Sequence, residues 1–312
     1  MNPELSIVIP IYNEEKNIVP LFTRLTNTLD RLDRNYEIIF VNDGSRDRSS
    51  FILNNIHTRN PSQVVIVEFI RNFGQHMAIL AGFEQAKGNT IVTLDGDLQN
   101  PPEEIPKLLE LINQGHDLVS GIRLYERQDN WFRKYISILI NKIRLIITNI
   151  KMTDHGCMLR AYSRNIIDLV IANNESSVFI PALAYSYAIN PTEIKVAHEK
   201  RSSGNSKYSI YSLIKLNFDL MTGYSLIPIQ IFTVLGCIVS LLSIIFIVSL
   251  LFRRLLLGLT IRGTSTMFAL SFLLIGILLV GLGIMGEYIG RIYKEVRKRP
   301  RFAIEKILER KK

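Results

Sequence analysis

Residues 90–99, TIVTLDGDLQ, decide the fold of this chain. Residues 90–94 are a short apolar run with the β-branched character of a buried strand, and a D-x-D-x-Q cluster follows directly. In an open α/β sheet, ligands bind in the crevice at the carboxyl ends of the strands. Because alternate residues of an extended segment point the same way, we expect Asp95, Asp97 and Gln99 to converge. Such oxygen ligands suit Mg²⁺ or Mn²⁺ that is also bound by substrate phosphates. The alternative interpretation of the cluster is an acidic surface loop.

Short β-rich apolar runs alternate with helical patterns through the first two thirds of the chain. This alternation predicts a mainly parallel sheet with helices on both faces, an α/β domain over residues 1–205. Strands are expected at 5–11, 36–42, 64–70 and 90–94, and helices at 17–32, 49–57 and 77–86.

Polar residues follow three of the expected strands. Tyr12 and Glu14 come after the first strand, Asp43 follows the second, and the D-x-D-x-Q cluster follows the fourth. A lone cluster of this kind is as often a turn or a helix cap, but three at one sheet edge predict a site. The chain has no G-x-x-x-x-G-K and no G-x-G-x-x-G motif, so we do not expect a glycine-rich loop to hold phosphates. Metal bridging by Asp97 and Gln99 would take that role.

The net charge of +9 is confined to the last part of the chain. Residues 1–228 contain 24 Lys and Arg against 24 Asp and Glu, whereas residues 229–312 contain 13 against 4. A nucleic-acid-binding protein is expected to carry its basic patch on the folded domain. Here the basic residues flank apolar segments. This pattern favours contact with anionic membrane lipids and argues against a nucleic-acid partner.

Two stretches without charged residues, 220–252 and 263–286, each exceed the roughly 20 residues that cross a bilayer as a helix. They predict transmembrane helices at 229–252 and 265–286, with a buried helical hairpin in a soluble protein as the alternative.

The basic residues of the tail, 287–312, outnumber the three arginines of the loop between the expected spans. The positive-inside rule therefore places both ends of the chain in the cytoplasm, and the absence of a cleavable signal agrees with this. Residues 206–228 mix apolar, aromatic and charged side chains. They predict an amphipathic helix lying on the membrane surface, with a plain surface helix as the alternative.

Three motifs, P-I-Y-N-E at 10–14, V-N-D-G-S at 41–45 and D-G-D-L-Q at 95–99, occur in that order. Together they resemble the GT-A glycosyltransferases of family two. The chain is more closely similar to polyprenyl-phosphate glycosyltransferases with two C-terminal transmembrane helices. Within that group, further stretches resemble the subfamily that transfers 4-deoxy-4-formamido-L-arabinose to undecaprenyl phosphate. These stretches are residues 72–76, 97–106, 131–134, 154–162 and 286–293.

The resemblance implies roles for residues that match the motifs of the family. The residues implied in binding the nucleotide sugar are Pro10, Tyr12, Glu14, Asp43 and Asp95, with Glu14 and Asp43 at the nucleoside and Asp95 by the ribose and diphosphate. The implied metal ligands are Asp97 and Gln99, with Asp95 beside them. Asp154, Arg123, Arg201 and Lys207 are implied near the phosphate of the lipid acceptor, and Arg133 is a weaker candidate.

The resemblance also implies an activity. The expected reaction is metal-dependent, inverting transfer of a sugar from UDP to undecaprenyl phosphate on the inner face of the bacterial cytoplasmic membrane. Its product would serve lipid A modification and polymyxin resistance, and a homotetramer is expected. The alternatives are a bactoprenol glucosyltransferase, an enzyme like dolichol-phosphate mannose synthase, a processive polysaccharide synthase, or a non-catalytic scaffold or flippase subunit.

The residue types agree with this chemistry. A phosphate monoester is an anion at neutral pH and is already a nucleophile, so it needs orientation and charge compensation more than proton removal. A metal would neutralise the leaving diphosphate, and arginines suit bidentate contact with phosphate. Asp154 therefore need not act as a base, and positioning an arginine is the alternative role.

Overall fold

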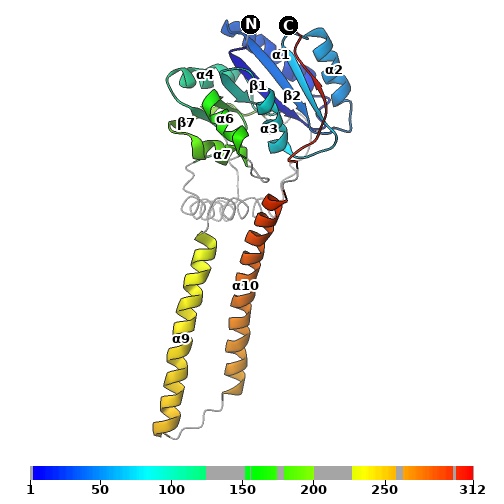
Figure 1. Ribbon diagram of the computed structural model, residues 1–312. Coiled ribbons are helices and arrows are strands. Elements are labelled where there is room, and N and C mark those ends of the chain that lie inside the picture. The colour runs from blue at the N-terminus through cyan, green and yellow to red at the C-terminus, as the bar shows by residue number, and fades with distance from the viewer. Residues whose placement is uncertain are drawn as a thin grey trace. The chain divides into compact units, whose positions relative to one another are not determined.

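The computed structural model of the chain describes residues 3–123, 152–154, 156–173, 179–199, 227–257, 263–297 and 300–311. The chain falls into two compact units. One contains a β-sheet with its helices and includes the C-terminal residues 300–311, and the other contains two long helices (Figure 1).

The described residues of the first unit form one eight-stranded sheet with strand order β7-β5-β6-β4-β1-β2-β3-β8. Strands β4, β1, β2 and β3 are parallel, whereas β6 and β8 run antiparallel to their neighbours. This is the mainly parallel α/β sheet that the sequence predicts. The strands are β1 (Leu5–Ile11), β2 (Tyr36–Asn42), β3 (Val64–Phe69), β4 (Thr90–Thr93), β5 (Leu118–Arg123), β6 (Arg160–Ser163), β7 (Pro191–Val196) and β8 (Ile304–Leu308).

Helices cover both faces of the sheet because successive strand residues alternate between the faces. In β1, Ile7 and Ile9 join the core beneath α1, α2 and α4, whereas Val8 joins the core beneath α3, α6 and α7. The helices are α1 (Ile18–Leu29), α2 (Ser49–Arg59), α3 (Gln75–Gln85), α4 (Ile105–Asn113), α6 (Arg164–Ala172) and α7 (Ile180–Tyr187), with 3₁₀ turns η1 (Asp30–Leu32) and η2 (Pro102–Glu104).

The strand directions bring several loops to one edge of the sheet. Strands β1, β2, β4 and β5 all end at this edge, since β5 is antiparallel to β6 and β6 is antiparallel to β4. The residues that precede β6 reach the same edge because β6 runs the opposite way. The loops that carry Tyr12, Asp43, Asp95 and Asp154 therefore meet there.

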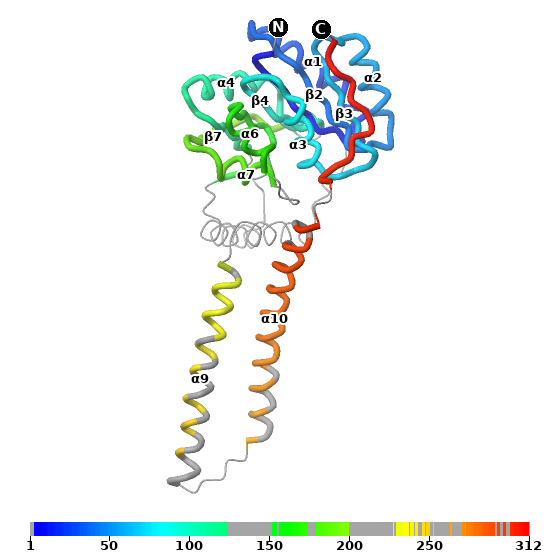
Figure 2. Tube along the Cα trace, viewed as in Figure 1, coloured from blue at the N-terminus to red at the C-terminus, as the bar shows by residue number. Residues whose placement is uncertain are grey.

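The C-terminal residues differ from the basic tail expected at 287–312. Helix α10 continues to Val296, and residues 304–308 then form β8, which pairs antiparallel with β3. Figure 2 shows this segment in red along the β3 edge of the sheet. The physical reason is that β3 would otherwise present an open row of backbone donors and acceptors, and β8 pairs with them.

The second unit contains α9 (Ile227–Leu257) and α10 (Thr264–Val296). Within the described residues, the stretch Leu273–Gly290 of α10 is long and apolar enough to cross a membrane. The expected span at 265–286 overlaps it. The expected span at 229–252 lies within α9, but the described residues do not establish it as a span.

Candidate active site

Two loops at the sheet edge are joined by hydrogen bonds between side chains and backbone. The backbone N–H of Asn13 donates to Ser45 Oγ at 3.0 Å, and the N–H of Arg46 donates to Asn13 Oδ1 at 2.8 Å. Two residues further along both loops, the N–H of Arg48 donates to Glu15 Oε2 at 3.0 Å. Each polar side chain thus satisfies backbone groups of the opposite loop. The loops after β1 and β2 are therefore held together by the protein itself.

A cavity of about 330 Å³ lies beside these loops. Tyr12 from the loop after β1, Asn42 from β2 and Asn72 from the loop after β3 line it, and Glu305 of β8 completes the wall. Arg46 and Arg71 add positive charge. Tyr12 is the predicted nucleotide-binding residue that the structure places in this wall.

Asp43 lies buried beneath the same loops. Its Oδ1 accepts from the backbone N–H of Phe73 at 2.6 Å, and its Oδ2 accepts from that of Gly74 at 2.9 Å. Burial raises the pKa of Asp43, and the two backbone hydrogen bonds oppose that rise. Asp43 thus fixes the loop that carries Asn72 to the cavity, and direct contact between Asp43 and a nucleoside stays a prediction.

The other predicted residues of the first motif lie against the D-x-D loop. A Cβ on Gly96 would lie 3.1 Å from the carbonyl oxygen of Pro10 and 3.9 Å from Glu14 Cγ. It would also lie 2.7 Å from Ile11 Cδ1, so a side chain at position 96 would push the D-x-D loop away from β1. The glycine between the two aspartates permits this close approach.

Asp95 is held by two amide side chains. Gln75 Nε2 donates to its Oδ1 at 2.6 Å, and Asn100 Nδ2 donates to its Oδ2 at 3.0 Å. Burial, together with the charge of Asp97, raises the pKa of Asp95 to about 7. The charge of Asp97 thus opposes ionisation of Asp95.

Such a carboxylate pair fits a divalent cation. Asp95 and Asp97 offer hard oxygen donors whose mutual repulsion a cation would relieve, and the backbone N–H of Gln99 donates to Asp97 Oδ1 at 3.1 Å. No cluster of three or more His, Cys, Asp or Glu side chains arranged for a metal occurs among the residues that the structure describes. A metal here would therefore need ligands from outside that set, as diphosphate oxygens would supply.

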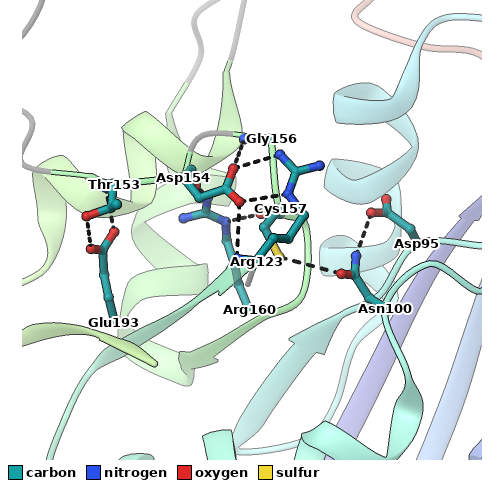
Figure 3. A network of polar contacts seen from close by, with 9 residues as sticks. All are labelled: Asp95, Asn100, Arg123, Thr153, Asp154, Gly156, Cys157, Arg160 and Glu193. Atoms are coloured by element: carbon teal, nitrogen blue, oxygen red, sulfur yellow. Dashed lines mark hydrogen bonds and ion pairs between the residues drawn. The ribbon is translucent and has the colours of Figure 1, made fainter. Parts of the chain in front are cut away.

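Arg123 and Asp154 form a bidentate ion pair. Arg123 Nε donates to Asp154 Oδ2 at 2.7 Å, and Arg123 Nη2 donates to Oδ1 at 2.8 Å (Figure 3). Burial alone would raise the pKa of Asp154, but the hydrogen bonds and charge of Arg123 bring it below its ordinary value. The backbone N–H of Gly156 also donates to Oδ1, at 2.9 Å. Of the four residues implied at the lipid phosphate, these two are brought together by the structure.

Arg160 anchors the loop that carries Asp154. Its side chain is fully buried, and its guanidinium donates to the carbonyl oxygens of Cys157 at 2.9 Å and Asp154 at 2.8 Å. It also donates to Ser120 Oγ at 2.7 Å. Figure 3 shows the Arg160 guanidinium beside Asp154, and Cys157 facing Asn100. Arg160 lies within the 154–162 stretch, but its residue type and spacing alone predict no role for it.

The chain after β7 also reaches this site. The backbone N–H of Glu199 donates to the carbonyl oxygen of Gln99 at 2.8 Å. Burial lowers the pKa of the neighbouring His198, the charge of Arg123 adds to this, and the charges of Asp97 and Asp154 oppose it. These charges place His198 among the candidate site residues. Its sequence surroundings give no motif that identifies it.

Three expected residues lie outside the described part of the chain. They are Arg133, Arg201 and Lys207, and the expected interfacial helix at 206–228 also lies outside it except for its last two residues. The roles expected of these residues stay predictions.

The chain was compared with known protein families, curated proteins and solved structures. The family model for glycosyl transferase family 2 matches residues 6–171. The chain belongs to this family. It is a glycosyltransferase, as the strand-end motifs predict.

Several relatives that are similar over nearly the whole chain carry the name undecaprenyl-phosphate 4-deoxy-4-formamido-L-arabinose transferase. The protein of Aeromonas hydrophila is 46% identical over 97% of this chain and 94% of its own length. The protein of Proteus mirabilis is 44% identical over 99% of this chain and 95% of its own length.

Among solved structures, the chain is similar to glucosyl-3-phosphoglycerate synthase from Mycobacterium tuberculosis in complex with Mn²⁺, UDP and phosphoglyceric acid. The identity is 15%, the TM-score is 0.48, and the match covers 70% of this chain and 76% of that one. Residues 1–349 of TarS from S. aureus match with 16% identity and a TM-score of 0.42, over 62% of this chain and 59% of that one.

Proposed function

We propose that this glycosyltransferase transfers 4-deoxy-4-formamido-L-arabinose from UDP to undecaprenyl phosphate. One observation carries the proposal: polar residues at the carboxyl ends of β1, β2, β4 and β5 meet at a single sheet edge in a chain 46% identical to enzymes with that name. The identity of the sugar rests on those relatives. The geometry of the edge supports the chemistry.

The donor side of the site is the cavity with the adjoining carboxylates. Amide, hydroxyl and carboxylate groups line the cavity, and these match the donors and acceptors of uracil and ribose. The diphosphate would lie by Asp95 and Asp97, which with Gln99 would hold Mg²⁺ or Mn²⁺. When bound, the cation neutralises charge that develops on the leaving UDP.

The acceptor side of the site is the Arg123–Asp154 pair. Asp154 holds the guanidinium of Arg123 in a fixed direction through two hydrogen bonds. A cation that is fixed in this way compensates the charge of an attacking phosphate without reorganising during the reaction. Direct attack by that phosphate on the anomeric carbon, with UDP leaving from the opposite face, inverts the anomeric centre.

We further propose that α9 and α10 both span the membrane, with the sheet-containing unit and the C-terminus on the cytoplasmic face. The apolar stretch of α10 and the charge-free sequence of α9 up to Phe252 support this arrangement. Arg201 and Lys207 are proposed to contact the lipid phosphate. Glu199, two residues before Arg201, already hydrogen-bonds to the D-x-D-x-Q loop. A homo-oligomer is part of the same proposal.

The test is transfer of labelled sugar to undecaprenyl phosphate in membranes that contain the protein. UDP-4-deoxy-4-formamido-L-arabinose is the expected donor, and UDP-glucose and GDP-mannose are compared with it. Preferred use of one of those two would replace the proposed sugar while leaving the reaction class intact. Release of free sugar without lipid product would overturn transfer to a polyprenyl phosphate.

The metal-binding role is tested with a charge-matched pair of variants. Asp97→Asn removes one carboxylate of the D-x-D loop, and Glu110→Gln removes an exposed carboxylate of α4. We expect Asp97→Asn to lower the transfer rate roughly a thousandfold, while Glu110→Gln stays near wild type. Full activity of the wild type in excess chelator would contradict a metal-dependent reaction.

A further inference from the structure

We propose that the C-terminal segment, residues 300–311, is part of the nucleotide-binding site, with Glu305 as a hydrogen-bond acceptor for the nucleoside of the donor. The inference deepens the proposed function and rests on it, because the ligand is the UDP portion of the donor. It gives β8 a role in binding besides covering an edge of the sheet.

The segment is bonded to the sheet-containing unit along its length. β8 pairs with β3, with Ile66 opposite Leu308 and Val67 opposite Ile307. Before β8, the Phe302 ring stacks on the Phe69 ring with centroids 5.1 Å apart and planes 13° from parallel. After β8, the backbone N–H of Lys311 donates to the carbonyl oxygen of Pro61 at 2.7 Å. Residues 302–311 are thus packed and hydrogen-bonded into this unit.

The same contacts reach the cavity wall. Phe69, Ile70 and Arg71 line the cavity, and the backbone N–H of Ile70 donates to the carbonyl oxygen of Ala303 at 3.2 Å. The Phe69 ring also contacts the Phe73 ring edge to face at 5.6 Å. Because Asp43 holds the backbone N–H of Phe73, the wall is fixed from two sides, by Asp43 and by the C-terminal segment.

Glu305 adds a carboxylate to this wall. A second carboxylate, Glu68, also lines the cavity, but its Oε1 already accepts from Ser50 Oγ at 2.6 Å. Glu305 forms no hydrogen bond or ion pair within the described part of the chain, and it is exposed. Uracil offers one N–H donor and ribose offers hydroxyl donors, and an ionised carboxylate accepts such bonds strongly. Of the two carboxylates in the wall, Glu305 is therefore the less engaged by the protein and the more available to a nucleoside.

The alternative is that β8 only covers the edge of β3, as many proteins cover an exposed edge strand. The two roles predict different effects of mutations on UDP affinity. If β8 only covers the edge, substitutions in it should change stability without changing UDP affinity. If β8 is part of the binding wall, a substitution at Glu305 should weaken UDP binding, and one at a neighbouring glutamate should not.

The deciding experiment is calorimetry of UDP with Mn²⁺ on the full-length protein in detergent. Glu305→Gln keeps the shape of the side chain and removes its charge, and Glu309→Gln does the same just beyond β8, outside the cavity wall. We expect Glu305→Gln to weaken UDP binding about tenfold, the effect of one charge-assisted hydrogen bond, and Glu309→Gln to change it less than twofold. Equal affinities in the two variants would overturn the inference.

A second pair of variants tests the support that the segment gives to the wall. Phe302→Ala removes the ring that stacks on Phe69, and Ile307→Ala removes apolar contacts further along β8, away from the cavity. Both should lower the melting temperature, but only Phe302→Ala should also weaken UDP binding, by about tenfold. If both variants bind UDP as the wild type does, the segment does not support the wall. Failure of the wild type to bind UDP would overturn the proposed donor itself, which distinguishes that failure from the failure of this inference.

Discussion

The carboxylate of Asp154 is surrounded by donors. It accepts from Arg123 Nε at 2.7 Å, from Arg123 Nη2 at 2.8 Å and from the backbone N–H of Gly156 at 2.9 Å. A carboxylate held in this way is stabilised in its charged form, which makes it a poor proton acceptor near neutral pH. Its contribution to the reaction is therefore the direction in which it holds Arg123.

This role predicts the behaviour of Asp154→Asn. An amide cannot accept both hydrogen bonds from Arg123, so we expect transfer to fall about tenfold to a hundredfold with UDP affinity unchanged. Breaking a partly buried pair should also lower the free energy of unfolding by about 2–3 kcal/mol at neutral pH. Transfer rates at varied undecaprenyl-phosphate concentration and calorimetry of UDP separate the two effects.

The pH dependence of that stability difference has a definite sign. Because the folded-state pKa of Asp154 is lowered, the stabilisation is present above the unfolded pKa of about 4 and is lost as pH falls through the folded value. Thermal unfolding in detergent should thus show the same gap between wild type and Asp154→Asn at pH 8 and pH 6. The gap should narrow below about pH 4. A gap that closes between pH 8 and pH 6 would mean that Asp154 titrates near neutrality.

Gly156 offers a second way to displace the same guanidinium. A Cβ at this position would lie 2.5 Å from Arg123 Nη2, so Gly156→Ala should push Arg123 out of its pairing geometry. We expect at least about a tenfold loss of transfer without loss of UDP binding. Thr153→Ala is the control in the same loop, because it removes only the 2.6 Å bond from Thr153 Oγ1 to Glu193. Normal transfer by Gly156→Ala would show that the position of Arg123 does not limit the reaction.

At the scale of elements, Arg24 on α1 joins two parts of the chain beside the site. Its guanidinium contacts Glu103 of η2 and Glu199, which follows β7, each at 2.8 Å. The hydrogen bonds to Glu199 and Glu103 raise the pKa of Arg24, so it stays charged at every accessible pH. Glu199 in turn bonds to Gln99 of the D-x-D-x-Q loop. The ion pairs therefore help to fix the loop after β7 over the candidate metal ligands.

Arg24→Lys should weaken this connection, because an ammonium cannot form two bidentate contacts. The pairs are partly exposed, so the expected loss in unfolding free energy is only about 1 kcal/mol and should shrink between 0.05 and 0.5 M salt, roughly the range over which screening becomes strong. Arg31→Lys is the control, since Arg31 forms no ion pair within the described residues. Salt-independent destabilisation of Arg24→Lys would point to lost packing instead of lost charge pairing.

The elements that the sequence predicts correctly are those with a local signal. The first four strands are largely apolar runs buried on both faces, and parallel pairing then brings Tyr12, Asp43 and Asp95 to one edge by geometry alone. β8 has no such signal: Ile304–Leu308 reads I-E-K-I-L, with two adjacent charged residues in a basic stretch, and its partner β3 lies far earlier in the chain. Pairing over that separation is a property of the folded sheet.

Among the site residues too, those with a local sequence signal could be predicted, and those that depend on tertiary packing could not. Asp95 and Asp97 could be predicted because both lie in one short motif directly after a strand. The two amides that hold Asp95 come from α3 and from the residue after Gln99, and their convergence depends on tertiary packing. Arg160 lies within a β-strand and is buried, where a sequence pattern predicts an apolar residue, so its hydrogen bonds are visible only in the structure.

At the scale of the whole molecule, charge and hydropathy divide the chain near residue 228, and the two units follow this division only in part. Residues 1–228 have no net charge, and the +9 lies in residues 229–312 around the apolar helices. The chain nevertheless returns to the first unit through β8, so that unit contains residues from both ends of the sequence. A truncation before α9 would therefore also remove β8 and expose the edge of β3.

This arrangement predicts how the protein behaves in cell fractions. The exposed side chains of α10 include Leu273, Leu278, Leu279 and Leu282, an apolar surface that a bilayer would cover. We expect the intact protein to remain in the membrane pellet after washing with 1 M salt or alkaline carbonate, since about 20 apolar residues in a helix insert almost irreversibly. Mild detergent should release it in active form. A peripheral protein held by its basic residues alone would leave the pellet in high salt, because screening weakens such contacts. Recovery in the salt wash would therefore remove the spanning role of α9 and α10, whereas release by detergent only would support it.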